Sequence, residues 1–403
     1  MRPLLVLLHR YLGLATALFL ALAGLTGSLL AFQHEIDEWL NPAFYHAPAQ
    51  GPLLSPGELV QRIEGAEPRL QVWYMEVPDE AGHAALMAAV PRTDPATGAP
   101  YDLHHRVIYL DPVSGAELGM RQWGACCLQA QNVIPFLLEF HYNLALPGNW
   151  GLLLMGLVAI LWVIDCFAGA WLTLPRGRPF LKKWWTAWTL KRRAGRYRRN
   201  LDLHRAGGLW LWLLLLPVAV SSVAMNLPEQ VFKPVVSLFS EAPPSTYQQR
   251  SQMPREALGE TRLDYQQVYK LAQTEGARLG IEGEIGELYY SFEYNFFGAG
   301  FGGHEANPLD KSWLFFHGTD GSLIGEEIAG RGTPGERFYR LQAPIHGGRI
   351  AGLPGRIVIA LLGLAIAGLS VTGVVIWWRK RQARRASAAR AREGRRAAFG
   401  QNL

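Results

Sequence analysis

The sequence predicts an α-helical membrane protein, a bundle of four transmembrane helices with two small α+β modules outside the membrane. Of its 403 residues, 49% are hydrophobic and only 18% are charged, whereas roughly a quarter of the residues of a soluble domain are charged. The apolar residues are concentrated in four blocks, each close to the ~20 residues that a helix needs to cross a bilayer. The two longest segments between the blocks contain alternating apolar runs, which are typical of β-strands.

The first apolar block, residues 12–32, is predicted to be a retained span. It is longer than the apolar core of a signal peptide, and no small-x-small cleavage site follows it. The other spans are predicted at residues 150–174, 209–227 and 356–378. Pro217 interrupts the third span, which membrane helices tolerate because neighbouring groups satisfy the freed carbonyl.

Basic residues predict the orientation of the chain. The loop at residues 175–203 and the tail at residues 379–403 are rich in lysine and arginine, and Asp202 is the only acid of that loop. The positive-inside tendency places both segments, and therefore both termini, in the cytoplasm. The net charge of +6 thus reflects topology and contact with anionic membrane lipid, and it requires no nucleic-acid partner.

The two outward segments, residues 33–133 and 228–344, are each predicted to form a small α+β module. Each contains a helix candidate, then strand candidates, then a glycine-closed turn. The helices are expected at 56–63 and 265–279, the strands at 70–77, 84–90, 106–110, 284–294, 313–316 and 322–328, and the turns at 111–115 and 317–321. Span, module and span therefore occur twice, which suggests two related halves.

Four histidines lie at the ends of the predicted spans. His9 and His204 lie at the cytoplasmic ends of the first and third spans, and His141 and His346 precede the second and fourth spans at the outer side. Two imidazoles from different helices suit the two axial positions of haem iron. A bare metal ion is less suited, since no Cys, Asp or Glu lies near either pair. We predict two molecules of haem b. For each histidine alone, an interfacial hydrogen-bonding role is the alternative.

Other polar residues near the spans have two interpretations. Arg10, Arg205 and Arg349 either pair with haem propionates or are ordinary cations whose stems cover apolar surface. His34 is a weaker candidate to replace an outer ligand, and a polar residue that ends the first span is the alternative. Asp165 is the only acid well inside a span, where such residues are often functional. It either pairs with Arg10 or Arg205 or makes an interhelical polar contact.

Three further signals bear on function. The G-x-G-x-x-G pattern at residues 298–303 precedes no amphipathic helix, so we expect a flexible loop flanked by aromatic residues and no dinucleotide site. Adjacent Cys126 and Cys127 could form a vicinal disulfide with a redox role, a structural pair or free thiols. No cytoplasmic segment is long enough for a flavin or nicotinamide domain. The electron donor is therefore expected to be a separate cytoplasmic protein or a membrane quinol.

Several short motifs resemble the PepSY-associated transmembrane family. They are His9-Arg10-Tyr11-Leu12-Gly13, Leu203-His204-Arg205, Pro344-Ile345-His346-Gly347-Gly348, the ending Trp377-Trp378-Arg379 and residues 165–175. The outer modules, including residues 109–115, resemble PepSY domains, although the second has His317-Gly318 where Asp-Pro is usual. Members of the family include haem-containing inner-membrane reductases that release iron from ferric siderophores. The resemblance implies that His9, His204, His141 and His346 are the axial ligands and that a ferric siderophore is the substrate, released as Fe(II).

Two other classes of function remain open. The first is a non-catalytic PepSY membrane protein that acts as a sensor, a peptidase-inhibitor-like binder or an assembly factor. The second is a transporter with Asp165 and the histidines along its pathway. Apart from these residues the predicted spans contain few polar side chains, which argues against a transport pathway.

Overall fold

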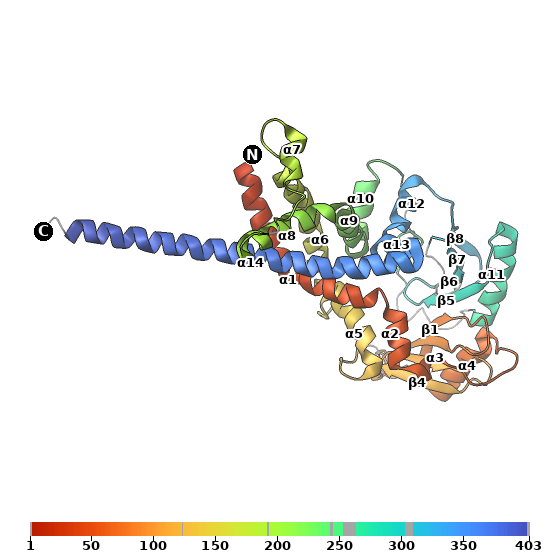
Figure 1. The fold of residues 1–403 in the computed structure, drawn as a ribbon. Coiled ribbons are helices and arrows are strands. Elements are labelled where there is room, and N and C mark those ends of the chain that lie inside the picture. Colours follow the sequence, from red (N-terminus) through yellow and green to blue (C-terminus); the bar gives the residue numbers. More distant parts are fainter. Residues whose placement is uncertain are drawn as a thin grey trace.

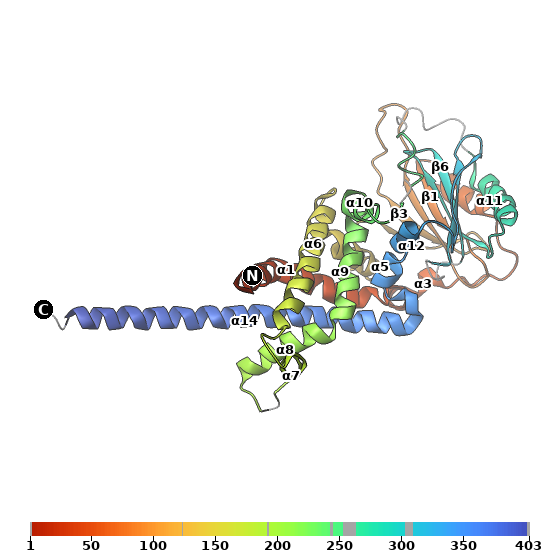
Figure 2. The ribbon, with the colours of Figure 1, turned by 90° about the horizontal axis from the view of Figure 1, so that it is seen from above.

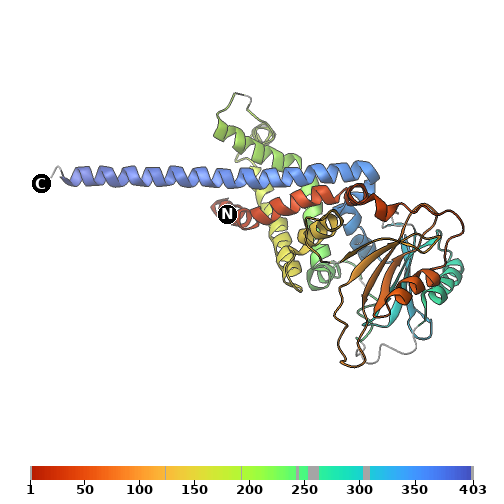
Figure 3. The same ribbon diagram turned by 90° about the horizontal axis from the view of Figure 1, so that it is seen from below.

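A computed structural model of the chain describes residues 2–122, 124–191, 193–241, 245–252, 263–302 and 309–400. The long helices occupy one part of the molecule and a β-sheet occupies the other, and both termini lie on the side away from the sheet (Figure 1). Figure 3 shows helix α14 running past the other helices to the end opposite the sheet.

Three helices are long and apolar enough to cross a membrane: α1 (Arg2–Leu30), α6 (Trp150–Thr173) and α14 (Gly352–Gly400). The predicted third span corresponds to two helices, α8 (Arg196–Trp210) and α9 (Trp212–Asn226), which meet at a bend of 70°. The bend follows the Gly207-Gly208 pair, and such pairs commonly permit sharp kinks. Pro217 lies inside α9 without ending it. The two helices together make a fourth span only if the bent pair is counted as one.

The long helices form two crossed pairs. Helix α1 packs along α14 and α6 packs along α9, and Figure 2 shows the second pair steeply inclined to the first. The four-helix transmembrane bundle predicted from the sequence is therefore seen in part, as three long apolar helices packed with a bent pair. Small residues bring α1 and α14 together: a Cβ atom on Gly24 would lie 2.5 Å from the carbonyl oxygen of Gly363. Ser28 Oγ also donates a hydrogen bond to the Ala360 carbonyl at 2.8 Å.

The two segments predicted to lie outside the membrane, residues 33–133 and 228–344, share one antiparallel sheet of eight strands, in the order β4-β3-β2-β1-β5-β6-β7-β8. The strands are β1 (Leu70–Glu76), β2 (Ala85–Pro91), β3 (Arg106–Leu110), β4 (Glu117–Gln122), β5 (Ile285–Ser291), β6 (Phe296–Phe301), β7 (Ser312–His317) and β8 (Leu323–Glu327). Strands β1 and β5 join the two halves through pairs such as Tyr74 with Tyr289 and Met75 with Leu288. The two segments predicted to form α+β modules thus contribute the two halves of one continuous sheet.

Helices α4 (Pro56–Ala66) and α11 (Tyr265–Leu279) pack on the same face of the sheet, one from each half. Each begins with a capping box, at Ser55 and at Asp264. Their apolar sides meet the sheet in a core whose fully buried members include Leu59, Val268, Leu288, Leu314 and Phe316. The amphipathic period of both helices and the alternation of the strands therefore have a common cause, burial against each other.

The glycine-rich segment is a strand and not the predicted flexible loop. Residues 296–301 form β6 in the interior of the sheet, while Gly303 lies outside the described residues. A Cβ atom on Gly298 would lie 2.2 Å from the Tyr289 ring, and one on Gly300 would lie 2.9 Å from the Trp313 ring. The glycines are therefore needed so that aromatic rings from the neighbouring strands can cover this strand.

The two glycine-closed turns have the same geometry despite their different sequences. The Asp111 amide donates to the Ala116 carbonyl, and the Gly115 amide donates to the Asp111 carbonyl. His317, Ser322 and Gly321 make the equivalent bonds in the second half, and both glycines have positive φ, at 70° and 72°. Replacement of Asp-Pro by His317-Gly318 thus leaves the turn intact.

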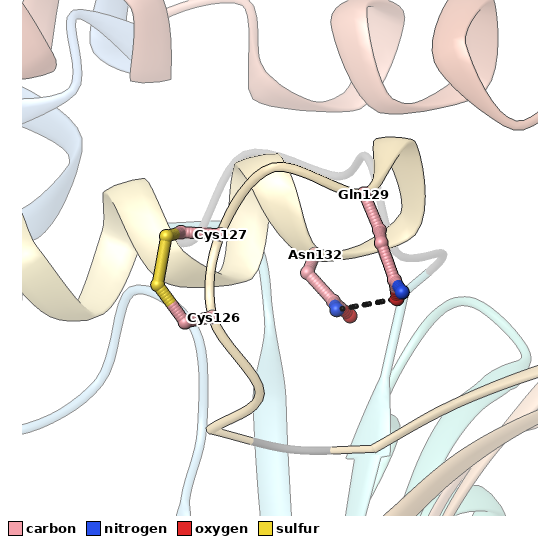
Figure 4. Close-up of a disulfide and its surroundings, with 4 residues drawn as sticks. All are labelled: Cys126, Cys127, Gln129 and Asn132. Carbon is pink, nitrogen blue, oxygen red and sulfur yellow. Dashed lines mark hydrogen bonds between the residues drawn. A yellow bond between two sulfur atoms is a disulfide. The ribbon is translucent and has the colours of Figure 1, made fainter.

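Short helices connect the sheet to the spans. They are α2 (Gln33–Leu40), α3 (Pro42–Tyr45), α5 (Ala130–Asn143), α10 (Lys233–Val236), α12 (Pro334–Arg340) and α13 (Gln342–His346), with single turns at Pro228–Phe232 and Arg349–Ala351. Another short helix, α7 (Phe180–Trp185), lies in the loop between α6 and α8. Cys126 and Cys127 form a disulfide in the segment that leads into α5 (Figure 4). At the start of that helix, Asn132 Nδ2 donates to Gln129 Oε1 at 3.3 Å.

Candidate functional site

The four histidines of the predicted sites lie in two facing pairs. His9 on α1 faces His204 on α8, with ring centroids 6.1 Å apart and ring planes at 46°. His141 on α5 faces His346 on α13, also at 6.1 Å, with planes at 66°. The pairing is the one inferred from the sequence. The outer histidines, however, lie on short helices that precede the spans and not on the spans themselves.

The two pairs lie at different ends of the long helices. Helix α8, with His204, lies at the end away from the sheet, whereas α13, with His346, lies between the long helices and the sheet (Figure 2). We therefore name them the inner pair, His9 and His204, and the outer pair, His141 and His346.

The ring separation in both pairs suits a shared metal ion. Two imidazoles that bind one ion at about 2 Å place their centroids about 6 Å apart, when a ring radius of about 1 Å is added on each side. Among the described residues, no three His, Cys, Asp or Glu side chains are grouped as around a bare metal ion. A pair without further protein ligands is instead suited to haem, whose porphyrin supplies the remaining donors.

The hydrogen bonds of the inner pair fix the tautomer of each ring. His9 Nδ1 donates to Asp165 Oδ1 at 2.8 Å. His204 Nδ1 lies 3.1 Å from the Leu369 carbonyl oxygen and 3.0 Å from Thr372 Oγ1. A carboxylate and a carbonyl only accept, so each Nδ1 carries the proton. The Nε2 lone pair of each ring is consequently available to a metal.

Hydroxyl groups play the same part at the outer pair. His141 Nδ1 lies 2.9 Å from Thr26 Oγ1, and His346 Nδ1 lies 3.0 Å from Ser221 Oγ. Each hydroxyl donates its only proton to a carbonyl one helical turn earlier, Leu22 for Thr26 and Val218 for Ser221. The hydroxyls therefore accept from the rings, and both Nδ1 atoms are protonated. No hydrogen bond joins Nε2 of any of the four rings to a residue within the described ranges.

Glycines lie against three of the rings. A Cβ atom would be 3.4 Å from His9 Cε1 at Gly169, 3.1 Å from His204 Cε1 at Gly373 and 3.0 Å from His141 Cε1 at Gly27. At Gly373 and Gly27 these distances are shorter than ordinary van der Waals contacts, so a side chain would press on the ring, whereas at Gly169 the contact would be an ordinary one. Gly373 and Gly27 thus help to preserve the ring orientations that the Nδ1 bonds select.

A cavity of 490 Å³ surrounds the inner pair, within the range of cofactor pockets. Both histidines and Asp165 line it together with apolar side chains from helices α1, α6, α8, α9 and α14. Five basic residues also line it: Arg2, Arg10, Arg205, Lys380 and Arg384. The walls therefore suit a flat apolar molecule that carries acidic groups.

The other predicted residues have different surroundings. Arg10 lines the cavity and has no ion pair with a described residue. Arg205 donates to Asp202 Oδ1 and to the Thr186 carbonyl, so its charge is already partly compensated. Arg349 lies in the single turn before α14.

For His34 and Asp165, the structure favours one of the two interpretations of each residue. The His34 ring packs edge-on against Tyr45 at 5.3 Å, whereas His141 and His346 face each other. Of the two interpretations of Asp165, the structure shows the interhelical polar contact and not the pairing with Arg10 or Arg205, since the Asp165 carboxyl on α6 accepts from His9 on α1. Asp165 is therefore a support for one of the facing histidines.

The sequence did not reveal which groups contact Nδ1 of His141, His204 and His346. One signal was present: Thr26 follows His9 at the same interval at which Ser221 follows His204. Both are hydroxyl residues, Thr26 on α1 and Ser221 on α9, and each supports the histidine that precedes the last long helix of its half. Leu369 acts through its backbone carbonyl, which no side-chain motif could reveal.

A family model described as the PepSY-associated TM region matches residues 6–380. The chain belongs to this family. No curated protein matches it. The matched residues include both histidine pairs, all eight strands and the apolar part of every long helix.

Proposed function

We propose that the protein is a di-haem reductase of the bacterial inner membrane that carries electrons from the cytoplasmic side to a periplasmic ferric siderophore. The observation that carries the proposal is the pair of facing histidine sets, each with Nδ1 engaged and Nε2 free. With both termini in the cytoplasm, as the basic loops indicate, the inner pair lies on the cytoplasmic side and the outer pair faces the periplasm.

The residues around the inner pair fit haem b. The cavity volume, its apolar walls and its basic lining match an iron porphyrin with two carboxylates. Bound there, haem supplies a one-electron couple of iron. His9 and His204 would hold its iron, and Asp165, Leu369 and Thr372 keep the two rings in place. Arg10 and Arg2 are the cavity cations that would neutralise propionates.

The outer pair fits the same role. Thr26 and Ser221 orient His141 and His346, and Gly27 leaves room beside the His141 ring. The chain's own contribution at both sites is to fix ring orientation and to exclude water through the surrounding helices. Reduction of Fe(III) to Fe(II) would weaken its binding to hard oxygen ligands and free it from a siderophore. The siderophore substrate is supported by the family resemblance alone.

Absorption spectroscopy of the detergent-purified full chain, produced with ample haem, tests the proposal. We expect a Soret band, sharp reduced α and β bands of low-spin haem, and two haems per chain. A colourless protein would overturn the proposal and favour the alternative, a non-catalytic PepSY membrane protein that senses, binds or assists assembly.

Alanine variants then test the assignment of the ligands. His9→Ala and His204→Ala should each remove the same haem, and His141→Ala and His346→Ala should each remove the other. His34→Ala is the matched control and should retain both haems. If variants of the inner and outer pairs removed the same haem, the assignment would be wrong. Anaerobic addition of a ferric chelate to the reduced wild type, with an Fe(II) trap, should oxidise the haems and yield trapped Fe(II).

A further inference from the structure

One of the four facing histidines differs from the others in what supports it. His141, His204 and His346 place Nδ1 against uncharged oxygens, namely hydroxyl groups and a backbone carbonyl. His9 alone donates to a carboxyl group, that of Asp165, at 2.8 Å. The inner pair therefore has an acidic support on one side, and the outer pair has none among the described contacts.

Asp165 also departs from the internal repeat. Gly169 lies against the His9 ring and Gly373 lies against the His204 ring, so the two glycines are equivalent. Asp165 precedes Gly169 by the same interval at which Leu369 precedes Gly373. The second half thus has an apolar side chain where the first half has a carboxyl group. The repeat shows that a backbone carbonyl and a hydroxyl are enough to hold such a ring.

The Asp165 carboxyl has no cation to neutralise it in the described part of the chain. Its side chain is 14% exposed, and its ion-pair contact is with His9. Arg205, one possible partner, is engaged by Asp202. A charged group in an apolar span is costly, and such groups are usually functional. Orientation of the His9 ring does not by itself require a carboxyl group, because the Leu369 carbonyl and Thr372 orient His204 without one.

Building on the proposed function, we propose that Asp165 is a positioning residue that lowers the reduction potential of a haem held by His9 and His204 below that of a haem held by His141 and His346. A carboxylate behind a metal-bound imidazole increases the electron donation of that ligand. It also places negative charge near the iron, which stabilises the ferric state over the ferrous state. Three neutral supports have neither effect to the same degree.

The consequence is a direction for electron flow. When one electron passes from the inner site to the outer site, the inner site is oxidised by one electron and the outer site is reduced by one electron, with no bond formed or broken. A lower potential at the inner site makes this exchange favourable toward the sheet side of the molecule. Asp165 would then oppose return of the electron to the cytoplasmic side.

Potentiometric titration of the full-length di-haem protein, followed by its optical bands, tests this inference. We expect two midpoint potentials in the wild type. Asp165→Asn keeps the size of the side chain and an accepting oxygen but removes the charge, so the lower midpoint should rise toward the upper one while the upper one stays unchanged. Asp165→Glu, which retains the charge, should move the lower midpoint less than Asp165→Asn does.

Thr26→Val is the matched control because it removes a neutral support from the outer pair. It should alter only the upper midpoint. The unchanged midpoint in each variant shows that the protein remains folded. If both haems are bound and neither midpoint moves in Asp165→Asn, the role of Asp165 is overturned while the di-haem function stands. Absence of haem from the wild type would instead overturn the proposed function itself.

Discussion

Arg121 on strand β4 connects helices α2 and α3 to the sheet through side-chain contacts. Its guanidinium group lies 5.3 Å from the Phe44 ring centre and 5.1 Å from the Tyr109 ring centre. Its Nη2 is 2.8 Å from Asp37 Oδ2 but is not directed as in a hydrogen bond, so charge attraction and the two rings hold it. Tyr45 Oη donates to the same carboxyl oxygen at 2.6 Å.

Replacement of Arg121 by Met should therefore be strongly destabilising. It would leave the Asp37 carboxyl buried without its cation, a change that costs about 3–5 kcal/mol. Denaturant unfolding followed by tryptophan fluorescence measures the loss. Arg69→Ala is the control, because Arg69 pairs with Glu67 at the surface with 53% of its side chain exposed, and such pairs contribute about 0–1 kcal/mol. Equal losses of unfolding free energy in the two variants would show that the buried pair stabilises the protein no more than the surface pair does.

At the scale of single residues, the sequence predicts which histidines face each other. It does not predict which groups form hydrogen bonds with their Nδ1 atoms. His9 and His204 share a short motif, so their equivalence is visible in the sequence. The Asp165 contact depends on which face of α6 meets α1, which the apolar sequence of α6 does not specify. The Leu369 carbonyl is a backbone group and carries no signature at all.

At the scale of elements, the turn at residues 111–115 depends on the Asp111 side chain. Its carboxyl accepts hydrogen bonds from the amides of Val113, Ser114 and Ala49. Burial alone would raise the pKa of Asp111, but these amides outweigh it and hold the pKa below its ordinary value of 3.8. The segment before α4 is thereby tied to the turn between β3 and β4.

Asp111→Ala should cost about 1–3 kcal/mol at neutral pH, since it leaves amide donors without their charged acceptor. Because the folded pKa is depressed, this stabilisation is complete above pH 3.8 and is lost as pH falls through the folded pKa. The difference between wild type and variant should consequently shrink in acid. Unfolding measured from pH 7 downward checks this. Asp320→Ala, at the exposed equivalent turn, should show a smaller loss, and a pH-independent difference would contradict the explanation.

Most elements of the sheet could be predicted because they alternate and end at turn residues. Strands β4 and β6 were not predicted. The glycines of β6 indicate a loop when the covering rings of Tyr289 and Trp313 are not known. The bend between α8 and α9 was missed for a similar reason. A continuous apolar run hides a break whose position depends on Gly207-Gly208 and on Trp212, whose Nε1 donates to the Cys166 carbonyl.

At the scale of the whole molecule, strands β1 and β5 make the outer part a single unit. Sequence alone could not show this, because strand pairing between distant segments is not encoded in either strand's alternation. We predict that the amides of the paired residues at this junction, among them Tyr74, Met75 and Leu288, are among the slowest of the sheet to exchange with deuterium. Strands β4 and β8, each with one neighbour, should exchange faster and serve as the control. Fast exchange in β1 and β5 would indicate independent modules.

The β1–β5 junction also reveals a symmetry. Met75 pairs with Met87 on β2 just as Leu288 pairs with Ala299 on β6, so Met75 and Leu288 are equivalent, and they pair with each other. A local two-fold axis therefore passes between them. His9 with His204 and His141 with His346 are likewise pairs of equivalent residues, one from each half.

The chain has the organisation of a homodimer with an isologous interface, joined into one polypeptide. In a true homodimer every substitution occurs twice. A joined chain can change one half only, and Asp165 opposite Leu369 is such a change.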